Sequence, residues 1–361
     1  MAWTATRRQL LTGLAAGAAW SLAPARLRAE KDRVVKAGFV YVGPVGDYGW
    51  TYRHDIGRRE VEAALGPQVE TSFVENVAEG ADAERVIRQL AAAGHDIIFA
   101  TSFGFMNAVV RVARQFPQVK FEHATGYKTA DNLAVYNARF HEGRSVIGTI
   151  AGHMTRSGIV GYVASFPIPE VVMGINAFML AMRRVRPDAV AKVVWVNSWY
   201  DPGKEADAAK ALIDQGADVI TQHTDSPAPL QVAEERGAYA FGQASDMSRF
   251  APRAHLTAII DNWGPYYVER VRAVLEGRWK SHMIWWGLKE GMVEIGPYHP
   301  DLPASVRKAA ERVRRGIIDG TVHPFAGPIR DQSGRLRVPE GKTLSDEELL
   351  RMDWYVEGVQ A

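Results

Sequence analysis

Two tryptophans occupy loops in which a ligand could contact them. Trp50 ends the loop Gly43–Trp50, and Trp199 lies just after the expected strand Lys192–Asn197. An indole at the end of a strand can stack on a flat heterocycle, and each stacked face contributes about 1–3 kcal/mol. Packing inside the core is the alternative for both side chains, and it is the commoner fate of tryptophan. The two positions therefore suggest an aromatic clamp and leave the core alternative open.

Polar and aromatic residues also stand where three further expected strands end. They are Ser102, Phe103 and Gly104 in one loop, Asp246 in a second, and Asn262 and Trp263 in a third. Hydroxyl, carboxylate, amide and backbone NH groups can bind the polar edge of a nitrogen heterocycle. Such contacts are needed, because a micromolar complex requires about −8 kcal/mol and two stacked faces supply less. Helix capping is the alternative role of these loops.

Motifs for phosphate binding, catalysis and metal binding are missing from the sequence. The glycines around Tyr48 in the loop Gly43–Trp50 do not fit GxGxxG, and no Gly-Lys-Ser/Thr follows them. The chain has no cysteine, no GxSxG and no HExxH, and its ten histidines are scattered. The lack of cysteine excludes disulfide bonds, thiolate metal sites and a lipid-modified N-terminal cysteine. We therefore expect a binding protein with no catalytic residue, metal or cofactor.

The elements that carry these loops alternate between strands and helices. The expected strands are Lys36–Val42, Glu70–Glu75, Asp96–Thr101, Val119–Thr125, Leu133–Asn137, Ile159–Ala164, Lys192–Asn197, Asp218–Gln222 and Leu256–Asp261. Helical stretches such as Tyr52–Leu65 and Ala81–Ala93 lie between most of them. Short apolar strands that alternate with helices indicate an α/β fold, in which helices cover both faces of parallel sheets.

One segment of the chain echoes another at a constant offset of 122 residues. Glu79–Ile98 and Asp201–Ile220 each contain a loop, an alanine-rich helix, a glycine stop and a buried strand. Asp201 followed by Pro202 is a typical N-cap and first-turn pair. Coincidence between two ordinary strand–helix units is the alternative explanation of the echo. Otherwise it indicates two similar lobes, whose strand ends would face one cleft that closes around a ligand.

Length and composition are those of a folded protein with more than one core. The chain has 361 residues, 47% of them hydrophobic and 23% charged, which excludes a disordered or collagen-like chain. Its length suggests two domains. The formal charge of +2 is too balanced for a protein that binds nucleic acid.

Residues 1–29 have the pattern of an export signal. Arg7 and Arg8 precede the apolar run Leu10–Leu22, and small residues follow, so we expect a Tat-type signal peptide. The run is shorter than the roughly 20 residues that a membrane-spanning helix needs. The segment carries four arginines and no acidic residue, so its removal changes the formal charge from +2 to −2.

Taken together, the loops resemble those of a known family. The chain is similar to the basic membrane protein family, the PnrA-like purine-binding components of ABC importers. The resemblance covers nearly all of the chain after the signal segment. The matching segments are KAGFVYVGPVGDYGWTYRHDIG at 36–57, ENVAEGADAERVIRQL at 75–90, ATSFGF at 100–105, FEHATGYKTADN at 121–132, VWVNSWYDPGKEADAAKALIDQGADVI at 194–220, FGQASDM at 241–247 and MDWYVEGV at 352–359.

The resemblance implies a two-lobed type I periplasmic-binding-protein fold with a purine between the lobes. Trp50 and Trp199 match the places of the two aromatic residues that stack on the base in this family. The family's Gly-Val-Asp-x-Asp loop reads Gly242–Asp246 here, so its first acid is lost. A lysine that the family places after the next strand has no match either. Because these groups suit ribose hydroxyls, the resemblance favours a free nucleobase, and a similar subgroup binds adenine.

Further expectations follow from the resemblance. The N-terminal lobe would comprise residues 34–138 plus 262–283, and the C-terminal lobe residues 139–261 plus 284–361. Asp246 would accept a hydrogen bond from an amine or ring NH of adenine. The other binding residues would be Tyr48, Ser102, Phe103, Gly104, Asn262 and Trp263. The protein would be a periplasmic monomer, not a lipoprotein, that delivers the base to an inner-membrane ABC permease.

Two alternatives to a nucleobase receptor remain. One is a receptor of the same fold that binds a nucleoside or a sugar. The other is a nucleoside-processing enzyme, which would need catalytic acids or a metal in the cleft. A transcription regulator with the same lobes would need an N-terminal helix-turn-helix, and the export signal occupies that position.

Overall fold

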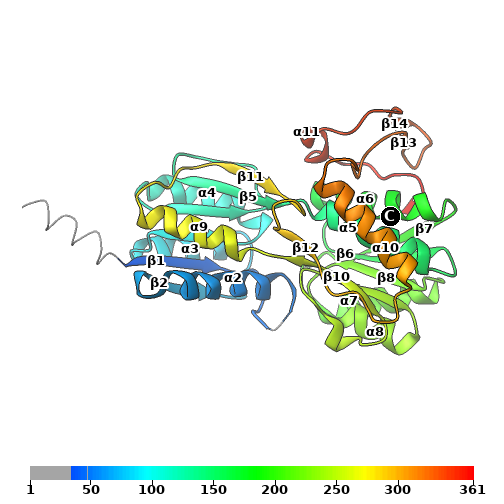
Figure 1. Cartoon of the computed structure of the whole chain (residues 1–361). Coiled ribbons are helices and arrows are strands. Elements are labelled where there is room, and N and C mark those ends of the chain that lie inside the picture. The colour runs from blue at the N-terminus through cyan, green and yellow to red at the C-terminus, as the bar shows by residue number, and fades with distance from the viewer. Residues whose placement is uncertain (1–33, 47) are drawn as a thin grey trace, which may run out of the picture.

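The computed structural model describes residues 34–46 and 48–361 (Figure 1). The predicted signal peptide, residues 1–29, lies outside the described residues. The described chain forms two α/β lobes, each built on its own sheet, and the chain crosses between the lobes more than once. In this part of the chain, no helix combines the length and the apolar character needed to cross a membrane.

The first lobe is built on a six-stranded parallel sheet. In spatial order its strands are β11 (Met283–Trp286), β5 (Leu133–Ala138), β4 (Lys120–Ala124), β3 (Ile97–Ala100), β1 (Val35–Val40) and β2 (Val69–Val74). Its helices are α2 (Gly49–Leu65), α3 (Ala81–Ala92), α4 (Met106–Gln115) and α9 (Gly264–Leu275). Helix α2 packs on α9, and α3 packs on α4. The two helix pairs contribute to separate hydrophobic clusters, as expected for a sheet that is covered on both faces.

The second lobe repeats this plan. Its seven strands are β12 (Val293–Ile295), β10 (His255–Asp261), β9 (Tyr239–Gly242), β8 (Val219–His223), β6 (Ile159–Ala164), β7 (Val190–Trp195) and β15 (Val359–Gln360). Among these strand pairs, only the pair of β10 with β12 is antiparallel. Its helices are α5 (Phe140–Met154), α6 (Pro169–Val185), α7 (Pro202–Asp214), α8 (Ala228–Arg236) and α10 (Ala304–Ile318). Helices α7 and α8 pack together, while α5 contacts α6 and α10.

Short elements complete the described chain. They are the 3-10 turns η1 (Gly66–Gln68), η2 (Phe103–Phe105) and η3 (Ser248–Phe250), the hairpin β13 (Ile329–Arg330) and β14 (Leu336–Val338), and the helix α11 (Asp346–Leu349). The last of these elements belong to a C-terminal segment that runs over the second lobe (Figure 1). Asn176 of α6 fixes this segment, because its side chain donates to the carbonyl of Trp354 at 2.7 Å and accepts from the NH of Val356 at 3.0 Å.

The strand–helix alternation predicted from the sequence is confirmed, and so is the α/β class of the fold. The echoed segments occupy equivalent places. Glu79–Ile98 contains α3 and enters β3 beside β1, whereas Asp201–Ile220 contains α7 and enters β8 beside β6. The predicted N-cap is present, since the Asp201 side chain accepts from the NH of Lys204. Strand β11 pairs with β5 as far as Trp286, three residues beyond the expected edge of the first lobe at residue 283.

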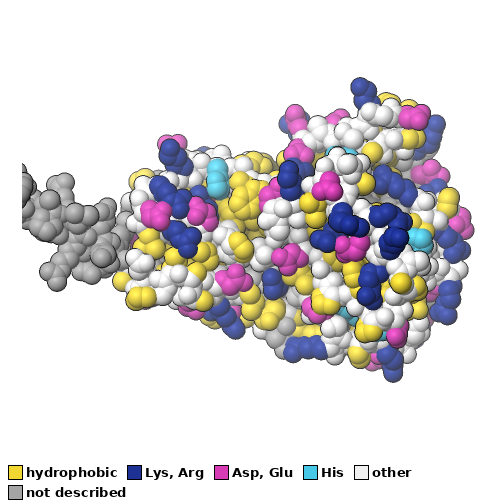
Figure 2. Space-filling model, in the orientation of Figure 1, with side chains coloured by type: hydrophobic (Ala, Val, Ile, Leu, Met, Phe, Trp, Pro, Cys, Tyr) yellow, Lys and Arg dark blue, Asp and Glu magenta, His cyan; other side chains and the backbone are white. Residues whose placement is uncertain are grey.

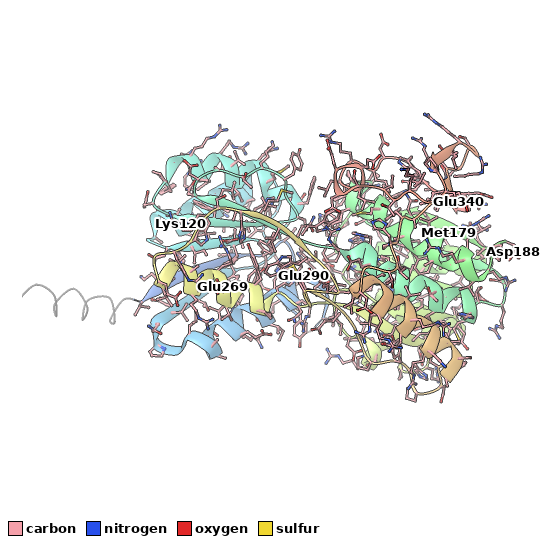
Figure 3. All side chains as sticks on the ribbon, turned by 45° about the horizontal axis from the view of Figure 1, so that its top comes forward. Lys120, Met179, Asp188, Glu269, Glu290 and Glu340 are labelled. Carbon is pink, nitrogen blue, oxygen red and sulfur yellow. The ribbon has the colours of Figure 1, made fainter. Side chains whose placement is uncertain are left out.

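Charged side chains mark the outer surface and the crossing between the lobes. Lys and Arg side chains gather over α10 on the face shown in Figure 2, and they include the exposed Arg307, Lys308, Arg312 and Arg315. These basic side chains therefore form a solvated face of the helix. Glu290 lies between the two lobes in Figure 3, where its side chain accepts from the NH of Gly287 at 2.8 Å.

Close packing of α5 on α6 gives a test of the second lobe. A Cβ on Gly148 of α5 would stand 2.3 Å from the carbonyl oxygen of Phe178 in α6, whereas one on Gly174 of α6 would stay at least 3.5 Å from its neighbours. Because backbone cannot yield easily, we expect Gly148→Ala to lower the free energy of unfolding by about 1–3 kcal/mol. The matched control Gly174→Ala should be neutral or stabilising by up to about 1 kcal/mol. Urea denaturation of both variants measures the difference, and equal stabilities would contradict the packing.

Candidate ligand-binding site

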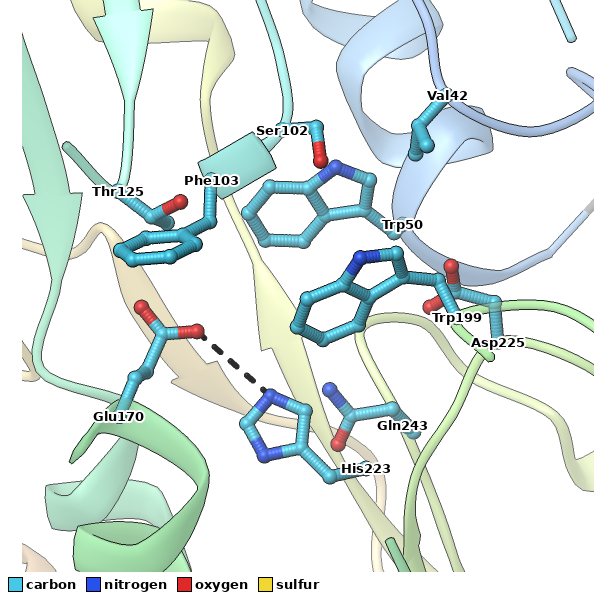
Figure 4. Close-up of a pocket in the computed structure, with 10 residues that line it drawn as sticks. All are labelled: Val42, Trp50, Ser102, Phe103, Thr125, Glu170, Trp199, His223, Asp225 and Gln243. Atoms are coloured by element: carbon cyan, nitrogen blue, oxygen red, sulfur yellow. Dashed lines mark ion pairs between the residues drawn. The ribbon is translucent and has the colours of Figure 1, made fainter. Parts of the chain in front are cut away.

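A pocket lies between the two lobes where the strands of both sheets end (Figure 4). It holds about 380 Å³ of space not filled by atoms, part of it open to solvent. Each lobe contributes five residues to its walls. Those of the first lobe are Val42, Trp50, Ser102, Phe103 and Thr125, and those of the second lobe are Glu170, Trp199, His223, Asp225 and Gln243.

Trp50 enters the pocket from the first turn of α2. Its indole Nε1 donates to the carbonyl of Thr101 at 2.7 Å, which fixes the ring's orientation. Behind it, His54 and Trp263 pack edge-on against the indole, with ring centroids 4.4 and 5.4 Å away. The ring therefore has a rigid back and one face available to the pocket. The side chain is partly buried: it packs against the core and also lines the pocket.

Trp199 enters from the opposite lobe, on the loop between β7 and α7. Its Nε1 donates to the carboxylate of Glu79 at 3.2 Å, and the same oxygen accepts from the hydroxyl of Ser102 at 2.6 Å. Glu79 belongs to the first lobe, so this carboxylate joins a wall residue of each lobe. A Cβ on Gly104 would come within 2.0 Å of the Glu79 side chain, which explains the glycine there.

The other expected binding residues take different places. Ser102 and Phe103 line the pocket. Trp263 is fully buried behind Trp50 and supports its indole. Asn262 donates to the carbonyl of Gly291 and to Glu294 at 3.1 Å each, so it fixes the crossing segment. Tyr48 does not line the pocket; its ring packs edge-on against Phe250 of the second lobe at 4.6 Å.

Asp246, expected to accept from the ligand, lies outside the pocket. Its side chain is exposed and accepts from the backbone NH of Ser248 at 2.9 Å, at the start of η3. The chain turns sharply before it, because Ala244 adopts a positive φ of 59°. Gln243, on the near side of that turn, supplies the polar group of this loop that reaches the pocket.

Three buried carboxyl groups gather at the pocket, and sequence reasoning singled out none of them as an acidic cluster. Burial, and then the nearby Asp261, raise the pKa of Glu170 to about 8. Burial raises the pKa of Asp261 to about 8 as well, against the opposing charges of Arg53 and Arg144. Burial, followed by Glu205 and Asp261, raises the pKa of Asp225 well above its usual range. Like charges in a desolvated site disfavour ionisation, so the cluster favours protonated acids.

The remaining polar wall is oriented by Arg144 of α5. Its guanidinium donates to the side-chain oxygen of Gln243, so the Gln243 amide NH₂ is the end left for a ligand. His223 ends β8, and burial lowers its pKa well below the usual range, which keeps the imidazole neutral. Its Nε2 lies 3.8 Å from a carboxyl oxygen of Glu170 (Figure 4).

Contacts of the α2 N-terminus hold the lobes together around the pocket. The NH of Gly49 donates to the Ser245 hydroxyl at 2.8 Å, and the NH of Trp50 donates to the carboxyl group of Asp225. Arg53 of the same helix donates to the carbonyl of Asp261 at 2.6 Å. A helix begins with unpaired NH groups, and the second lobe satisfies two of them here. The structure therefore has its lobes closed on one another.

The walls suit an uncharged heterocycle better than a phosphate or a metal ion. Two indoles and a phenylalanine present flat apolar surfaces, and carboxyl, amide and imidazole groups stand at their edges. Within residues 34–46 and 48–361, no three His, Asp or Glu side chains are arranged to hold a metal ion.

Comparison with known families identifies the protein's class. The sequence pattern of the family described as "ABC transporter substrate-binding protein PnrA-like" matches residues 34–322. The chain belongs to this family. The predicted family membership is thereby confirmed. A PnrA-like protein is a substrate-binding component of an ABC transporter, not an enzyme, and works outside the cytoplasm with a permease in the membrane.

Individual relatives agree with this class. A purine-binding protein of Brucella abortus is 59% identical over 331 residues, which cover 92% of this chain and 94% of that protein. A putative ABC transporter glucose-binding protein of Haloferax volcanii is 37% identical, with 92% and 82% covered. Among solved structures, a solute-binding protein from Aeropyrum pernix superimposes with a TM-score of 0.69 at 19% identity, covering 81% and 94% of the two chains. It supports the fold of this PnrA-like chain.

The raised pKa of Glu170 gives a prediction for the ligand-free protein. Because its folded-state pKa, about 8, exceeds the ordinary 4.5, the folded state holds the proton more tightly and loses stability as pH rises between these values. Glu170→Gln removes this loss. The stability of the variant relative to wild type should therefore grow by about 1–3 kcal/mol between pH 5.5 and 7.5. Urea denaturation at both pH values measures it.

The exposed Glu340, labelled in Figure 3, provides the control for this measurement. Glu340→Gln should leave the difference between the two pH values as it is in wild type. A stability difference between Glu170→Gln and wild type that stays constant from pH 5.5 to 7.5 would contradict the protonated state of Glu170.

Proposed function

We propose that this PnrA-like protein binds a purine nucleobase, most favourably adenine, and delivers it to an ABC permease of the inner membrane. The base would stack between Trp50 and Trp199 while the two lobes close around it. One observation carries the proposal: an indole from each lobe lines the same pocket, and groups able to donate or accept hydrogen bonds stand at its edge. The likeness to a purine-binding protein supports the same class of ligand.

Stacking and edge contacts share the binding energy in this proposal. Two indole faces supply about 2–6 kcal/mol, and a micromolar complex requires about 8 kcal/mol. The amide NH₂ of Gln243 can donate to a ring nitrogen, and the carboxyl groups of Glu170 and Asp225 can accept from ring NH and amino groups. These edge groups are buried, so a ligand that leaves one of them without a hydrogen-bond partner would bind more weakly.

The pocket favours a free base over a nucleoside. Ribose needs hydroxyl partners, and the two groups that the resemblance associates with ribose are absent from the walls. Ala244 stands where the loop loses its first acid, and none of the ten wall residues is a lysine.

The sequence before residue 30 and the family bear on where the protein works. We propose that residues 1–29 export it by the Tat route and that it acts as a soluble periplasmic monomer. In this view the lobes comprise residues 34–138 with the crossing segment through β11, and residues 139–261 with the chain beyond β11. Closure of the lobes on the base would present the surface that the permease recognises.

Calorimetric titration tests the choice of ligand. We expect adenine to bind with micromolar or tighter affinity, and guanine, adenosine, ribose and glucose to bind at least tenfold more weakly. Adenosine far ahead of adenine would contradict the nucleobase proposal. Ribose or glucose ahead of adenine would favour a sugar receptor of the same fold. Release of free base from adenosine during the titration would instead indicate an enzyme.

Removal of one indole tests the clamp. Trp199→Ala should weaken adenine binding by roughly 5- to 150-fold, the equivalent of one stacking face of about 1–3 kcal/mol. Trp50→Ala should weaken adenine binding at least as much, because it also removes the ring that packs against Trp263. Trp354 is partly buried in the C-terminal segment, outside the pocket, so Trp354→Ala is the matched control and should bind adenine as wild type does. Wild-type affinity in both pocket variants would refute the clamp.

A further inference from the structure

The carboxyl group of Glu170 lies on the α6 side of the pocket. Glu170 lies in the first turn of α6, and 13% of its side chain is exposed, toward the pocket. Among the described residues no hydrogen bond reaches its carboxyl group, and one of its oxygens lies 3.8 Å from Nε2 of His223. Figure 4 shows the group at the end of the pocket formed by Phe103 and Thr125. A ligand is therefore the natural partner for both of its oxygens.

The charged and titratable groups around Glu170 come from several elements. Asp261 ends β10, Asp225 follows β8, His223 ends β8, and Arg144 lies on α5. Asp261 interacts electrostatically with both Glu170 and Asp225, so it couples the three acids. Arg144 is the cation that acts on Glu170, and its guanidinium is engaged by Gln243 and Thr221. Glu170 also borders an adjoining hollow lined by Glu347 and Arg351, and these two exposed side chains pair with each other at 3.1 Å. Several acids beside cations that are already engaged favour the uncharged form of Glu170.

The protonation state of a carboxyl group decides which purine edge it matches. A neutral carboxylic acid donates from its hydroxyl and accepts at its carbonyl. Adenine presents that same combination, an amino donor beside a ring-nitrogen acceptor, on each of two edges. An ionised carboxylate only accepts, and it matches guanine, whose ring NH and amino group are adjacent donors. Guanine also matches the neutral acid, through its ring NH beside O6, so ionisation of this residue removes the match to adenine and keeps a match to guanine.

We propose that Glu170 selects the base as a neutral carboxylic acid, its hydroxyl donating to a ring nitrogen of adenine and its carbonyl accepting from the exocyclic amine. This rests on the proposed function and adds to it the residue that sets its specificity. Trp50 and Trp199 would hold any purine, because every base has two faces for stacking. Glu170 would discriminate among the purines at the edge.

The acid–base properties of the site agree with this role. Burial and Asp261 raise the pKa of Glu170 to about 8, so the group is mostly protonated at neutral pH. If only the protonated form binds adenine, the affinity is constant well below pH 8 and falls about tenfold for each pH unit well above it. The neutral His223 does not supply a charge that would reverse this behaviour.

Calorimetry with adenine at pH 6.5 and pH 9 tests the proposal on the full protein. For wild type we expect an affinity about tenfold lower at pH 9. Glu170→Gln keeps a donor and an acceptor but cannot titrate, so it should bind adenine at both pH values with little change. Asp261→Asn is the control: it removes the neighbouring acid and leaves Glu170 able to titrate, so the affinity should still fall with pH, beginning at a lower pH than in wild type because Asp261 raises the pKa of Glu170.

The outcomes separate this inference from the proposed function. If wild type does not bind adenine at pH 6.5, the proposed function itself fails. If adenine binds but wild type and Glu170→Gln show the same pH profile, only the inference is overturned. It is also overturned if Asp261→Asn, and not Glu170→Gln, removes the pH dependence. Circular dichroism and the unfolding midpoint establish that each variant is folded.

A second measurement, the ratio of adenine affinity to guanine affinity, tests selectivity directly. For wild type this ratio should fall about tenfold between pH 6.5 and pH 9, because the ionised carboxylate still matches guanine but not adenine, and in Glu170→Gln it should stay constant. Equal losses of affinity for both bases on raising the pH would show that Glu170 does not select the base, and this would overturn the proposal.

Discussion

The pocket exists because the first turn of α2 is completed by the opposite lobe. Tyr48 at its N-cap position supplies no side-chain cap, and the turn contains no acidic residue. Ser245 and Asp225 accept from the first NH groups instead. Gly49 allows this approach, because it has a φ of 80° and a Cβ there would stand 2.6 Å from the carbonyl oxygen of Asp225. The same turn carries Trp50, so the contact that closes the lobes also positions the indole.

Closure in turn places three acids in a desolvated space. Asp225 reaches the α2 N-terminus, whose partial positive charge favours a carboxylate, yet burial still raises its pKa. Asp261 ends the strand that leads into the crossing segment, and neither of its oxygens finds a hydrogen-bond partner among the described residues. Glu170 faces the ligand space. An acid without partners costs stability in the empty protein, and that cost is recovered when a ligand supplies the missing hydrogen bonds.

The sequence predicts the fold better than it predicts the polar residues that line the pocket. The apolar strands and the echo at an offset of 122 residues indicate two similar lobes. Ligands bind beyond the carboxyl ends of parallel strands, and this rule leads to Trp50, Trp199 and the Ser102 loop. The same rule applied to β6 and β8 leads toward Glu170 and His223, but Glu170 lies beyond the loop in the first turn of α6 and His223 is the last residue of a buried strand, so no loop pattern marks them. The sequence predicts Asp246 in the pocket, but a positive φ at Ala244 turns the chain before it, and no spacing pattern encodes that turn.

The contacts that close the lobes and the contacts that select the ligand use largely different side chains. Closure pairs backbone groups of Gly49, Trp50 and Asp261 with the side chains of Ser245, Asp225 and Arg53, and of these three side chains only Asp225 also lines the pocket. Selection uses side chains such as Glu170 and Gln243, which can change without disturbing closure. A fold organised in this way can keep one closing geometry while its walls diverge. The identity of the ligand must therefore be inferred from the residues that line the pocket and their protonation states, because the fold carries little information about it.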